Sequence, residues 1–168
     1  AMARVEAAGS RCDPRSGVRG RTVFERAWRG LRAYELQTEP QELPEGRLVN
    51  HVVTLNLGSD LVSEARIDGQ DWETHRTPHH GVGAIPADLP YATREHQAGD
   101  YLVVEIAPGF VESALGQSAR RAELHPFFAA RDPFAAHVML ALAEEARSGD
   151  GGSSVSAEGT SGRSVPGL

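Results

Sequence analysis

Hydrophobic and polar residues alternate in short runs through the centre of the chain, from His51 to Pro108. In the clearest run, 51–57, every second side chain shares one face of an extended strand. Gly, Asp and Pro separate the runs, which is typical of consecutive antiparallel strands. The pattern predicts strands at 31–36, 51–57, 61–67, 70–77, 84–85, 91–96 and 101–106, and an acidic, proline-containing loop over 38–48.

Helix signals follow the last strand. Pro108 fits a first helical turn and Gly116 fits a C-cap, so a short helix is expected over 108–115. Asp132 is a good N-cap before Pro133, which starts a longer helix. An apolar stripe runs down that helix and is our candidate dimer interface: Ala135, Val138, Met139, Leu142 and Ala146. Packing on the strands is the commoner use of such a stripe, and that alternative stays open.

The fold class is therefore mainly β with C-terminal helices. Four segments are expected along the chain. They are a flexible N-terminal arm at 1–22, a β-barrel at 23–107, a helical segment at 108–147 and a Gly/Ser-rich tail or linker at 148–168.

The dipeptide Asp68-Gly69 predicts a two-residue hairpin turn. If these are the two central turn residues, Ala65 pairs with Trp72 and Ser63 pairs with Thr74. One face of the hairpin then carries an indole, hydroxyls and a guanidinium among apolar side chains. The opposite face is mostly charged, so the first face is expected to point inward.

A mixed inner face suits a barrel that holds a small polar ligand. The predicted ligand-binding residues are Trp72, Thr74, Arg76 and, at the mouth, Tyr91. The alternative interpretation is that Trp72 belongs to the core and Arg76 lies at the solvated rim.

Charge and composition limit the classes of protein to which this chain can belong. The formal net charge is −6, so the domain as a whole does not attract phosphate backbones. The single Cys12 cannot form an internal disulfide, which fits a reducing compartment. No apolar run approaches the roughly 18 residues of a membrane helix, and the N-terminus has no signal-peptide core. A cytoplasmic protein with no membrane contact is expected.

A series of segments along the chain matches a known pattern: HVVTLNLG, the Asp68-Gly69 hairpin, AIPADLPY, DYLVVEIAPGFVESAL and ELHPFFAARDPFAAHVMLALAEEAR. Over residues 28–147 this series resembles the N-terminal sensor domain of AraC-type transcription regulators. The resemblance implies a cupin-like jelly-roll β-barrel followed by two helices that form a homodimer. It also implies a small-molecule effector in the barrel, an arm that contacts the ligand or the DNA-binding domain, and a separate C-terminal pair of helix-turn-helix motifs.

The expected function is an effector-binding and dimerisation domain of an AraC-like regulator, without cofactor or catalytic residues. Residues 148–168 cannot form two helix-turn-helix units, so DNA is expected to be read only through a C-terminal domain absent from this chain. An isolated sensor, a truncated regulator and a stand-alone cupin are all compatible with the sequence.

A metal-dependent cupin enzyme is the alternative. Its candidate ligands are His75, His79, His80 and His96 with Glu64 or Glu73. The usual pair of His separated by one residue is absent, Tyr91 occupies the place of the later His, and the predicted register turns His75 outward. No Ser-His-Asp order, P-loop or dinucleotide fingerprint is present. We therefore predict no metal site and no enzyme activity.

Overall fold

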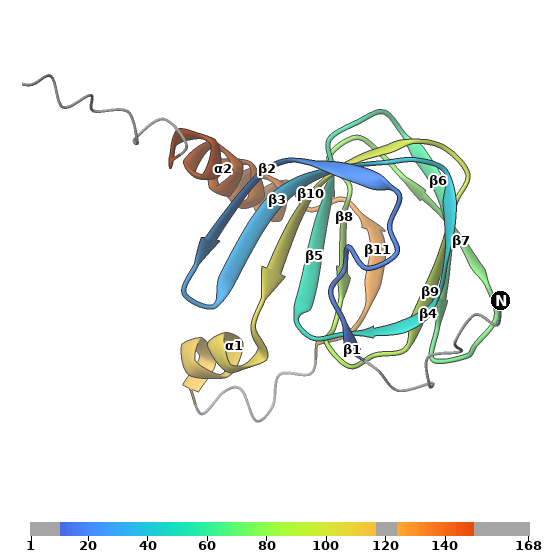
Figure 1. Ribbon diagram of the computed structural model, residues 1–168, viewed down its shortest axis with the longest axis horizontal. Helices are drawn as coiled ribbons and strands as arrows, with labels where there is room; N and C mark the ends of the chain where they lie inside the picture. Colours follow the sequence, from blue (N-terminus) through green and yellow to red (C-terminus); the bar gives the residue numbers. More distant parts are fainter. Residues whose placement is uncertain (1–10, 117–123, 150–168) are drawn as a thin grey trace, which may run out of the picture.

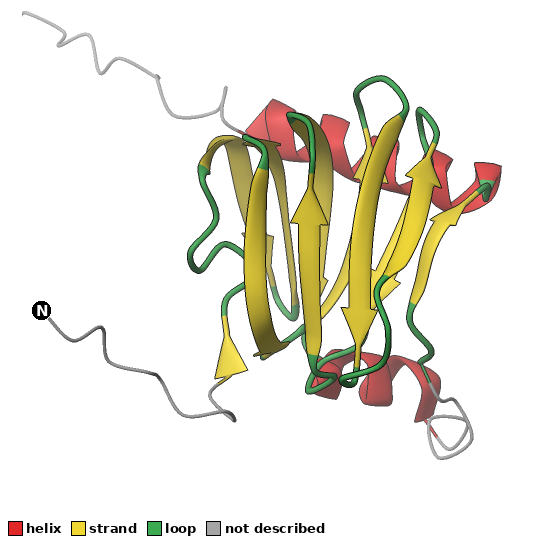
Figure 2. Cartoon of the chain, turned by 90° about the vertical axis from the view of Figure 1, so that its right-hand side faces the viewer, coloured by secondary structure: helices red, strands yellow, loops and turns green. Residues whose placement is uncertain are grey.

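The protein folds into two β-sheets that face each other, with a long helix across the outside of one of them (Figure 1). The structure, a computed structural model, describes residues 11–116 and 124–149. Figure 2 shows the strands running side by side, with one helix behind their upper ends and a second below.

The strand order within each sheet identifies the topology. One sheet has the order β1-β4-β9-β6-β7, with bounds Arg11–Cys12, Gln41–Leu48, Tyr91–Glu95, Leu61–Ile67 and Glu73–Thr77. The other has the order β11-β8-β5-β10-β3-β2, with bounds Phe127–Ala130, Val82–Ile85, His51–Asn56, Gly99–Ile106, Leu31–Thr38 and Gly20–Trp28. All pairs are antiparallel except β1 with β4.

From β3 to β10 the chain crosses from one sheet to the other at almost every connection, and only β6 and β7 form a hairpin within one sheet. This gives the interleaved strand orders 3-10-5-8 and 4-9-6-7 of a jelly roll. The predicted fold class is confirmed: a cupin-like jelly roll followed by C-terminal helices.

The six-stranded sheet is buried on both faces because side chains alternate along its strands. On the central strand β10, Tyr101 and Val103 face the space between the sheets. The alternate residues Leu102 and Val104 face outward, where helix α2 covers them. The molecule therefore has two buried layers, one between the sheets and one between a sheet and a helix.

Both helices begin where the sequence predicts. Helix α1 (Pro108–Leu115) ends at Gly116, whose φ of 55° favours glycine. Helix α2 (Pro133–Gly149) is capped by Asp132, whose Oδ1 accepts a hydrogen bond of 3.0 Å from the Ala135 N–H. No helix in the described ranges is both long and apolar enough to cross a membrane.

Two predicted segments differ from the structure. The expected loop over 38–48 contains β4, because Pro44 lies at a register shift between Leu43 and Gly46, where no ladder hydrogen bond is required of it. The described part of the expected arm, 11–22, contains β1 and the start of β2. Residues 1–10 of that arm, and 150–168 of the predicted tail, lie outside the described residues.

Candidate functional site

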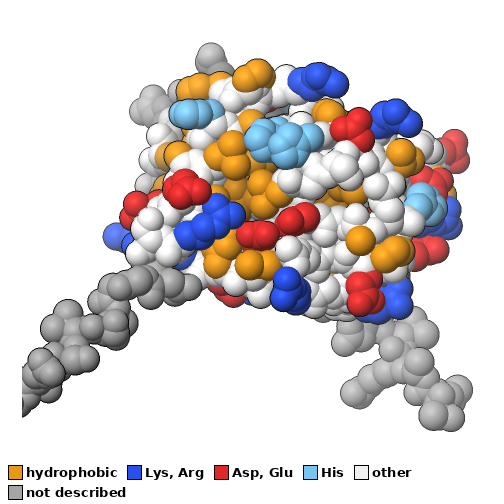
Figure 3. All heavy atoms as spheres, turned by 90° about the horizontal axis from the view of Figure 1, so that it is seen from above, with side chains coloured by type: hydrophobic (Ala, Val, Ile, Leu, Met, Phe, Trp, Pro, Cys, Tyr) orange, Lys and Arg blue, Asp and Glu red, His pale blue; other side chains and the backbone are white. Residues whose placement is uncertain are grey.

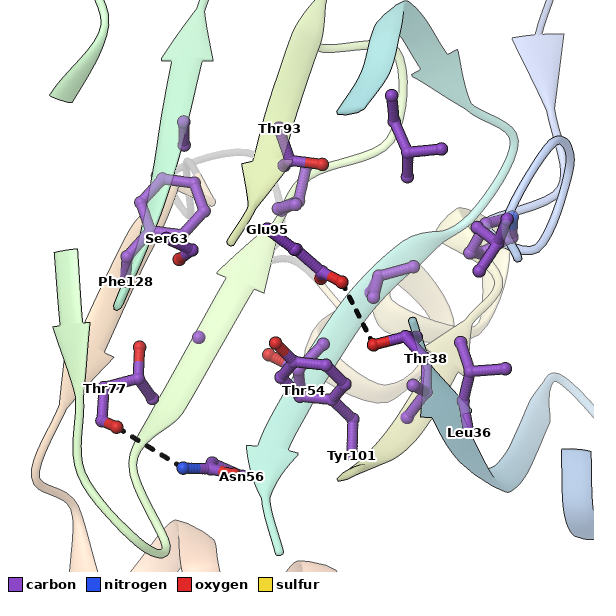
Figure 4. Close-up of a pocket in the computed structure, with 18 of the residues that line it drawn as sticks. Leu36, Thr38, Thr54, Asn56, Ser63, Thr77, Thr93, Glu95, Tyr101 and Phe128 are labelled. Carbon is purple, nitrogen blue, oxygen red and sulfur yellow. Dashed lines mark hydrogen bonds between the residues drawn. The ribbon is translucent and has the colours of Figure 1, made fainter. Parts of the chain in front are cut away.

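A cavity of about 150 Å³ lies between the two sheets (Figure 4). The six-stranded sheet contributes Thr54 from β5 and Tyr101 from β10, and the facing sheet contributes Ser63 from β6 with Thr93 and Glu95 from β9. Because these strands lie far apart in sequence, the jelly roll itself brings the polar groups together. A volume of this size holds a ligand about as large as one benzene ring.

Glu95 is the carboxylate that points into this cavity (Figure 4). Its Oε2 accepts a hydrogen bond of 3.0 Å from the Thr38 hydroxyl on the opposite sheet. Burial raises the pKa of Glu95 above its ordinary value, and hydrogen bonds from Thr38, Tyr101 and Gln41 offset this only in part. Burial in the cavity therefore shifts the ionisation equilibrium of Glu95 towards the neutral form.

Gly99 makes room for this arrangement. A Cβ atom at Gly99 would overlap the Tyr101 ring and lie 2.9 Å from the Thr38 Oγ1 atom. The missing side chain lets both hydroxyl-bearing residues approach Glu95 from the strand ends. We expect substitution of Gly99 to displace the donors of Glu95 before it disturbs the rest of the barrel.

The remaining wall is divided between apolar and hydroxyl-bearing side chains. Leu36, Val52, Ile85 and Val103 line the apolar part. The hydroxyls of Thr54, Ser63 and Thr93 have no side-chain hydrogen-bond partner within the described part of the chain. The cavity thus offers hydroxyl groups without side-chain partners beside a carboxyl group whose pKa is raised by burial.

Asn56 fixes the loops at one end of the cavity. Its amide nitrogen donates to the backbone carbonyls of Ser59 at 2.8 Å, Pro78 at 3.0 Å and Thr77 at 3.3 Å (Figure 4). Its Oδ1 accepts from the Gly58 N–H at 3.0 Å. Because all its polar atoms are engaged, Asn56 is a structural residue that holds two loops together.

A network of ionic side chains lies at the end where β1 enters. Arg32 donates to the buried Glu105 at 2.9 and 2.6 Å and to Asp13 at 2.8 Å. Burial acts to raise the pKa of Asp13, but the Arg15 backbone N–H and the Arg32 guanidinium outweigh it and lower the pKa. Residues 13–18 are thereby tied to the barrel, and Pro14 and Val18 line the cavity.

The predicted hairpin turn is correct, but the predicted register beyond it is wrong. Asp68 and Gly69 have φ values of 49° and 70°, and the Gln70 N–H donates to the Ile67 carbonyl at 2.9 Å. Ala65 then pairs with Glu73, one residue later than predicted. One extra residue in the second strand acts as a bulge, and it turns every following side chain to the opposite face.

This shift moves three of the four predicted ligand-binding residues out of the barrel. Trp72 packs outside, with the Arg94 guanidinium 3.8 Å and the Arg66 guanidinium 5.1 Å from its ring centroid. Thr74 and Arg76 are exposed. Of the four, Tyr91 lines the cavity, and burial raises its pKa.

The same shift turns His75 inward, where it stacks on Phe128 at 4.6 Å between ring centroids. The other candidate metal ligands lie in separate places: His96 contacts Glu64 at 2.8 Å, and His79 stacks on His80. Within 11–116 and 124–149, no three His, Cys, Asp or Glu side chains are placed to hold a metal ion. The described cavity lining includes two carboxyl residues, Glu64 and Glu95, with hydroxyls, phenols and amides but no His or Cys, and this set does not fit a transition-metal centre.

The predicted helix stripe is partly displaced. Met139 and Ala146 are buried, but Val138 is 43% exposed, and Ala136 and Ala143 complete the buried face. Small residues at this spacing allow the helix to approach the sheet closely. The predicted stripe did not include Ala136 and Ala143.

Sequence reasoning did not select Glu95, Thr38 or Tyr101. A signal for Glu95 was present, because alternation along 91–96 places it on the same face as Tyr91. No local pattern connects Thr38 with Tyr101, since they meet only through the pairing of β3 with β10.

No protein-family model matches this sequence, and no curated protein is significantly similar to it. Solved structures do match. A cupin superfamily protein from Desulfitobacterium hafniense is 11% identical over 53% of this chain and 78% of that chain, with a TM-score of 0.43. The Cnp3 cupin domain of Schizosaccharomyces pombe is 15% identical over 58% and 69%, also with a TM-score of 0.43.

The DMSP lyase DddQ of Ruegeria pomeroyi is 19% identical, with a TM-score of 0.43, and the match covers 62% of this chain and 55% of that chain. These similarities concern the fold alone. The order of the strands carries the conclusion that this chain has a cupin-like jelly roll.

Proposed function

We propose that this protein binds a small molecule between its two sheets and serves as the effector-binding and dimerisation domain of an AraC-like transcription regulator. The observation that supports binding is the cavity itself, in which hydroxyl groups without partners stand beside Glu95. Unpaired polar groups inside a barrel are costly unless a ligand or water satisfies them. We propose a binding role without chemistry of its own.

The regulatory part of the proposal rests on the resemblance over residues 28–147. A signal would pass from the cavity to helix α2 through β3 and β10, because these two strands line the cavity with one face and contact α2 with the other. A ligand shifts such a system only by its difference in affinity between two states. DNA contact is proposed only through a separate domain, since this chain carries a net charge of −6.

Homodimerisation is proposed through the outer face of α2. Phe134 is 79% exposed and Val138 is 43% exposed, one helical turn apart. If these residues form the contact, Val138→Glu will reduce the sedimentation coefficient to that of a monomer. Val49→Glu makes the same change at a 48% exposed valine between β4 and β5, away from α2, and is the control. A monomeric parent protein at high concentration would contradict this part of the proposal.

The binding proposal is tested by thermal-shift screening with sugars, amino acids, amines and aromatic acids. Any compound that raises the melting temperature is then measured against Ser63→Leu, which fills the cavity from β6. Val62→Leu is the matched control, because the neighbouring side chain points to the opposite face of the same strand. Equal binding by the two variants would show that the compound binds elsewhere.

A further inference from the structure

The charges around the cavity restrict the ligands that it can accept. Among the described residues that line it, none is Arg or His, and the chain contains no Lys. Glu95 is the acidic group that points inward. A buried carboxylate or phosphate on a ligand would find no cation to pair with, and an unpaired buried charge is strongly unfavourable.

The ionic network at the end of the barrel does not supply a free cation either. Its members are two arginines and three carboxylates: Arg15, Arg32, Asp13, Glu25 and Glu105. Both arginines are already paired, Arg32 with Glu105 at 2.6 Å and Arg15 with Glu25 at 2.9 Å. This network therefore carries a net charge of −1 and offers no excess positive charge to an anionic ligand.

Among the described residues, Glu95 has no positively charged partner. Its hydrogen-bond donors are the neutral groups of Thr38, Tyr101 and Gln41, and they leave the pKa raised by burial. A cation next to Glu95 would stabilise the carboxylate and compensate for the lost solvation. The free hydroxyls of Thr54, Ser63 and Thr93 can accept further hydrogen bonds, as an ammonium group with three N–H donors requires.

We infer that the cavity recognises a small aliphatic primary amine, held through its ammonium group by Glu95 and the neighbouring hydroxyls. This inference rests on the proposed function, since it names the ligand class of the same cavity. The aliphatic part of the amine packs against Leu36, Val52 and Val103. The volume of about 150 Å³ restricts the ligand to a few heavy atoms. Binding displaces a proton from Glu95, so affinity rises with pH until the carboxyl is fully ionised in the free protein.

The test is isothermal titration calorimetry with three compounds of matched shape: isopentylamine, 3-methylbutanol and 3-methylbutanoate. We expect the amine to bind at least about tenfold more tightly than the other two. In buffers of different ionisation enthalpy, amine binding is expected to release a proton at pH values where Glu95 of the free protein is still partly protonated. Equal or tighter binding of the alcohol or the carboxylate would overturn the inference.

Glu95→Gln provides the residue-level test, because it keeps the shape and removes the charge. We expect about a tenfold or greater loss of amine affinity, with alcohol affinity unchanged. Glu73→Gln makes the same charge change at a side chain that is 74% exposed, and it should bind like the parent. Circular dichroism confirms that both variants fold. Unchanged amine affinity in Glu95→Gln would overturn the inference.

The outcomes separate the ligand class from the binding function. If the alcohol or carboxylate binds and Ser63→Leu abolishes that binding, the amine inference is wrong and the cavity is still a ligand site. If none of the three compounds binds, the amine inference is overturned. If the wider screen also finds no compound sensitive to Ser63→Leu, the proposed function is overturned as well.

Discussion

The six-stranded sheet buries both of its faces, but against different partners. Its outer face meets α2 through aliphatic and small side chains, including Leu102, Ala33 and Ala143, which are fully buried. Its inner face presents tyrosines and threonines of β3, β5 and β10 to Glu95 on the second sheet, and a cavity lies between the two sheets. Strands with the same backbone thus build a dry, closely packed layer on one side and a polar, incompletely filled layer on the other.

The difference teaches where stability and function lie in this molecule. Because buried apolar side chains pack closely, the sheet–helix layer is expected to be sensitive to the loss of a single methylene group. The layer between the sheets contains hydroxyls without side-chain partners and a carboxyl group with a raised pKa, and both features reduce the stability of the folded protein. Perturbed carboxyl groups in cavities are typical of binding and active sites.

The largest expected effect is in the dry layer. Leu102→Ala removes a side chain with no exposed surface from the sheet–helix contact. We expect the free energy of unfolding to fall by about 2–5 kcal/mol, as measured by chemical denaturation. Val23→Ala, at a residue that is about half exposed, is the control and should change it far less. A loss as small as that of the control would mean that α2 does not seal this face.

Two adjacent valines compare the layers directly. Val103 faces the cavity and Val104 faces α2, and each is 4% exposed. We expect Val104→Ala to cost about 2–3 kcal/mol and Val103→Ala about 1–2 kcal/mol, because Val103 already borders an unfilled space. Equal losses in denaturation experiments would indicate that the two layers are packed equally well.

Much of this contrast could be predicted from the sequence, because alternation identifies both faces of a strand. The runs at 51–57 and 101–106 correctly predicted β5 and β10. The helix caps Asp132 and Gly116 also correctly placed an end of each helix. These signals depend on residues close together in the sequence, and such residues form the same local structure in the folded protein.

The cavity residues could not be predicted in the same way. A single bulged residue after Gly69 reversed the side chains of β7 and moved Trp72 outside, although the turn itself was correctly predicted. A bulge depends on how a strand pairs with the adjacent strand, and the sequence of one strand alone does not predict that pairing. The meeting of Glu95 with Thr38 depends on the closure of two sheets, so it becomes visible only in three dimensions.

A third prediction concerns pH and the polar layer. Because the pKa of Glu95 is higher in the folded state than in the unfolded state, the folded state binds more protons between the two values. Stability of the ligand-free protein must then decrease as pH rises through this window. Glu95→Gln is expected to reduce that decrease, measured by denaturation at a series of pH values.

Asp100 acts in the same direction, since burial and the nearby Glu35 raise its pKa. Glu95→Gln should therefore leave a residual decrease, and Asp100→Asn should remove a further part of it. Glu73→Gln, at an exposed position, is the control for the change in net charge. A pH profile identical to that of the parent in Glu95→Gln would show that Glu95 ionises freely in the folded state.

The smallest expected effect lies outside both layers, at Trp72. The ring is stacked between Arg94 and Arg66 on the outer face of the five-stranded sheet, with guanidinium distances of 3.8 and 5.1 Å. Trp72→Leu keeps an apolar side chain but removes both cation–π contacts, each worth about 0.5–1 kcal/mol at an exposed site. We expect a loss of stability of about that size and no change in the affinity of any ligand that Ser63→Leu excludes. Stability and ligand affinity measured on the same variants show which face of this sheet the ligand contacts. If Trp72→Leu weakened ligand binding as strongly as Ser63→Leu does, the ligand would contact the exterior of the barrel.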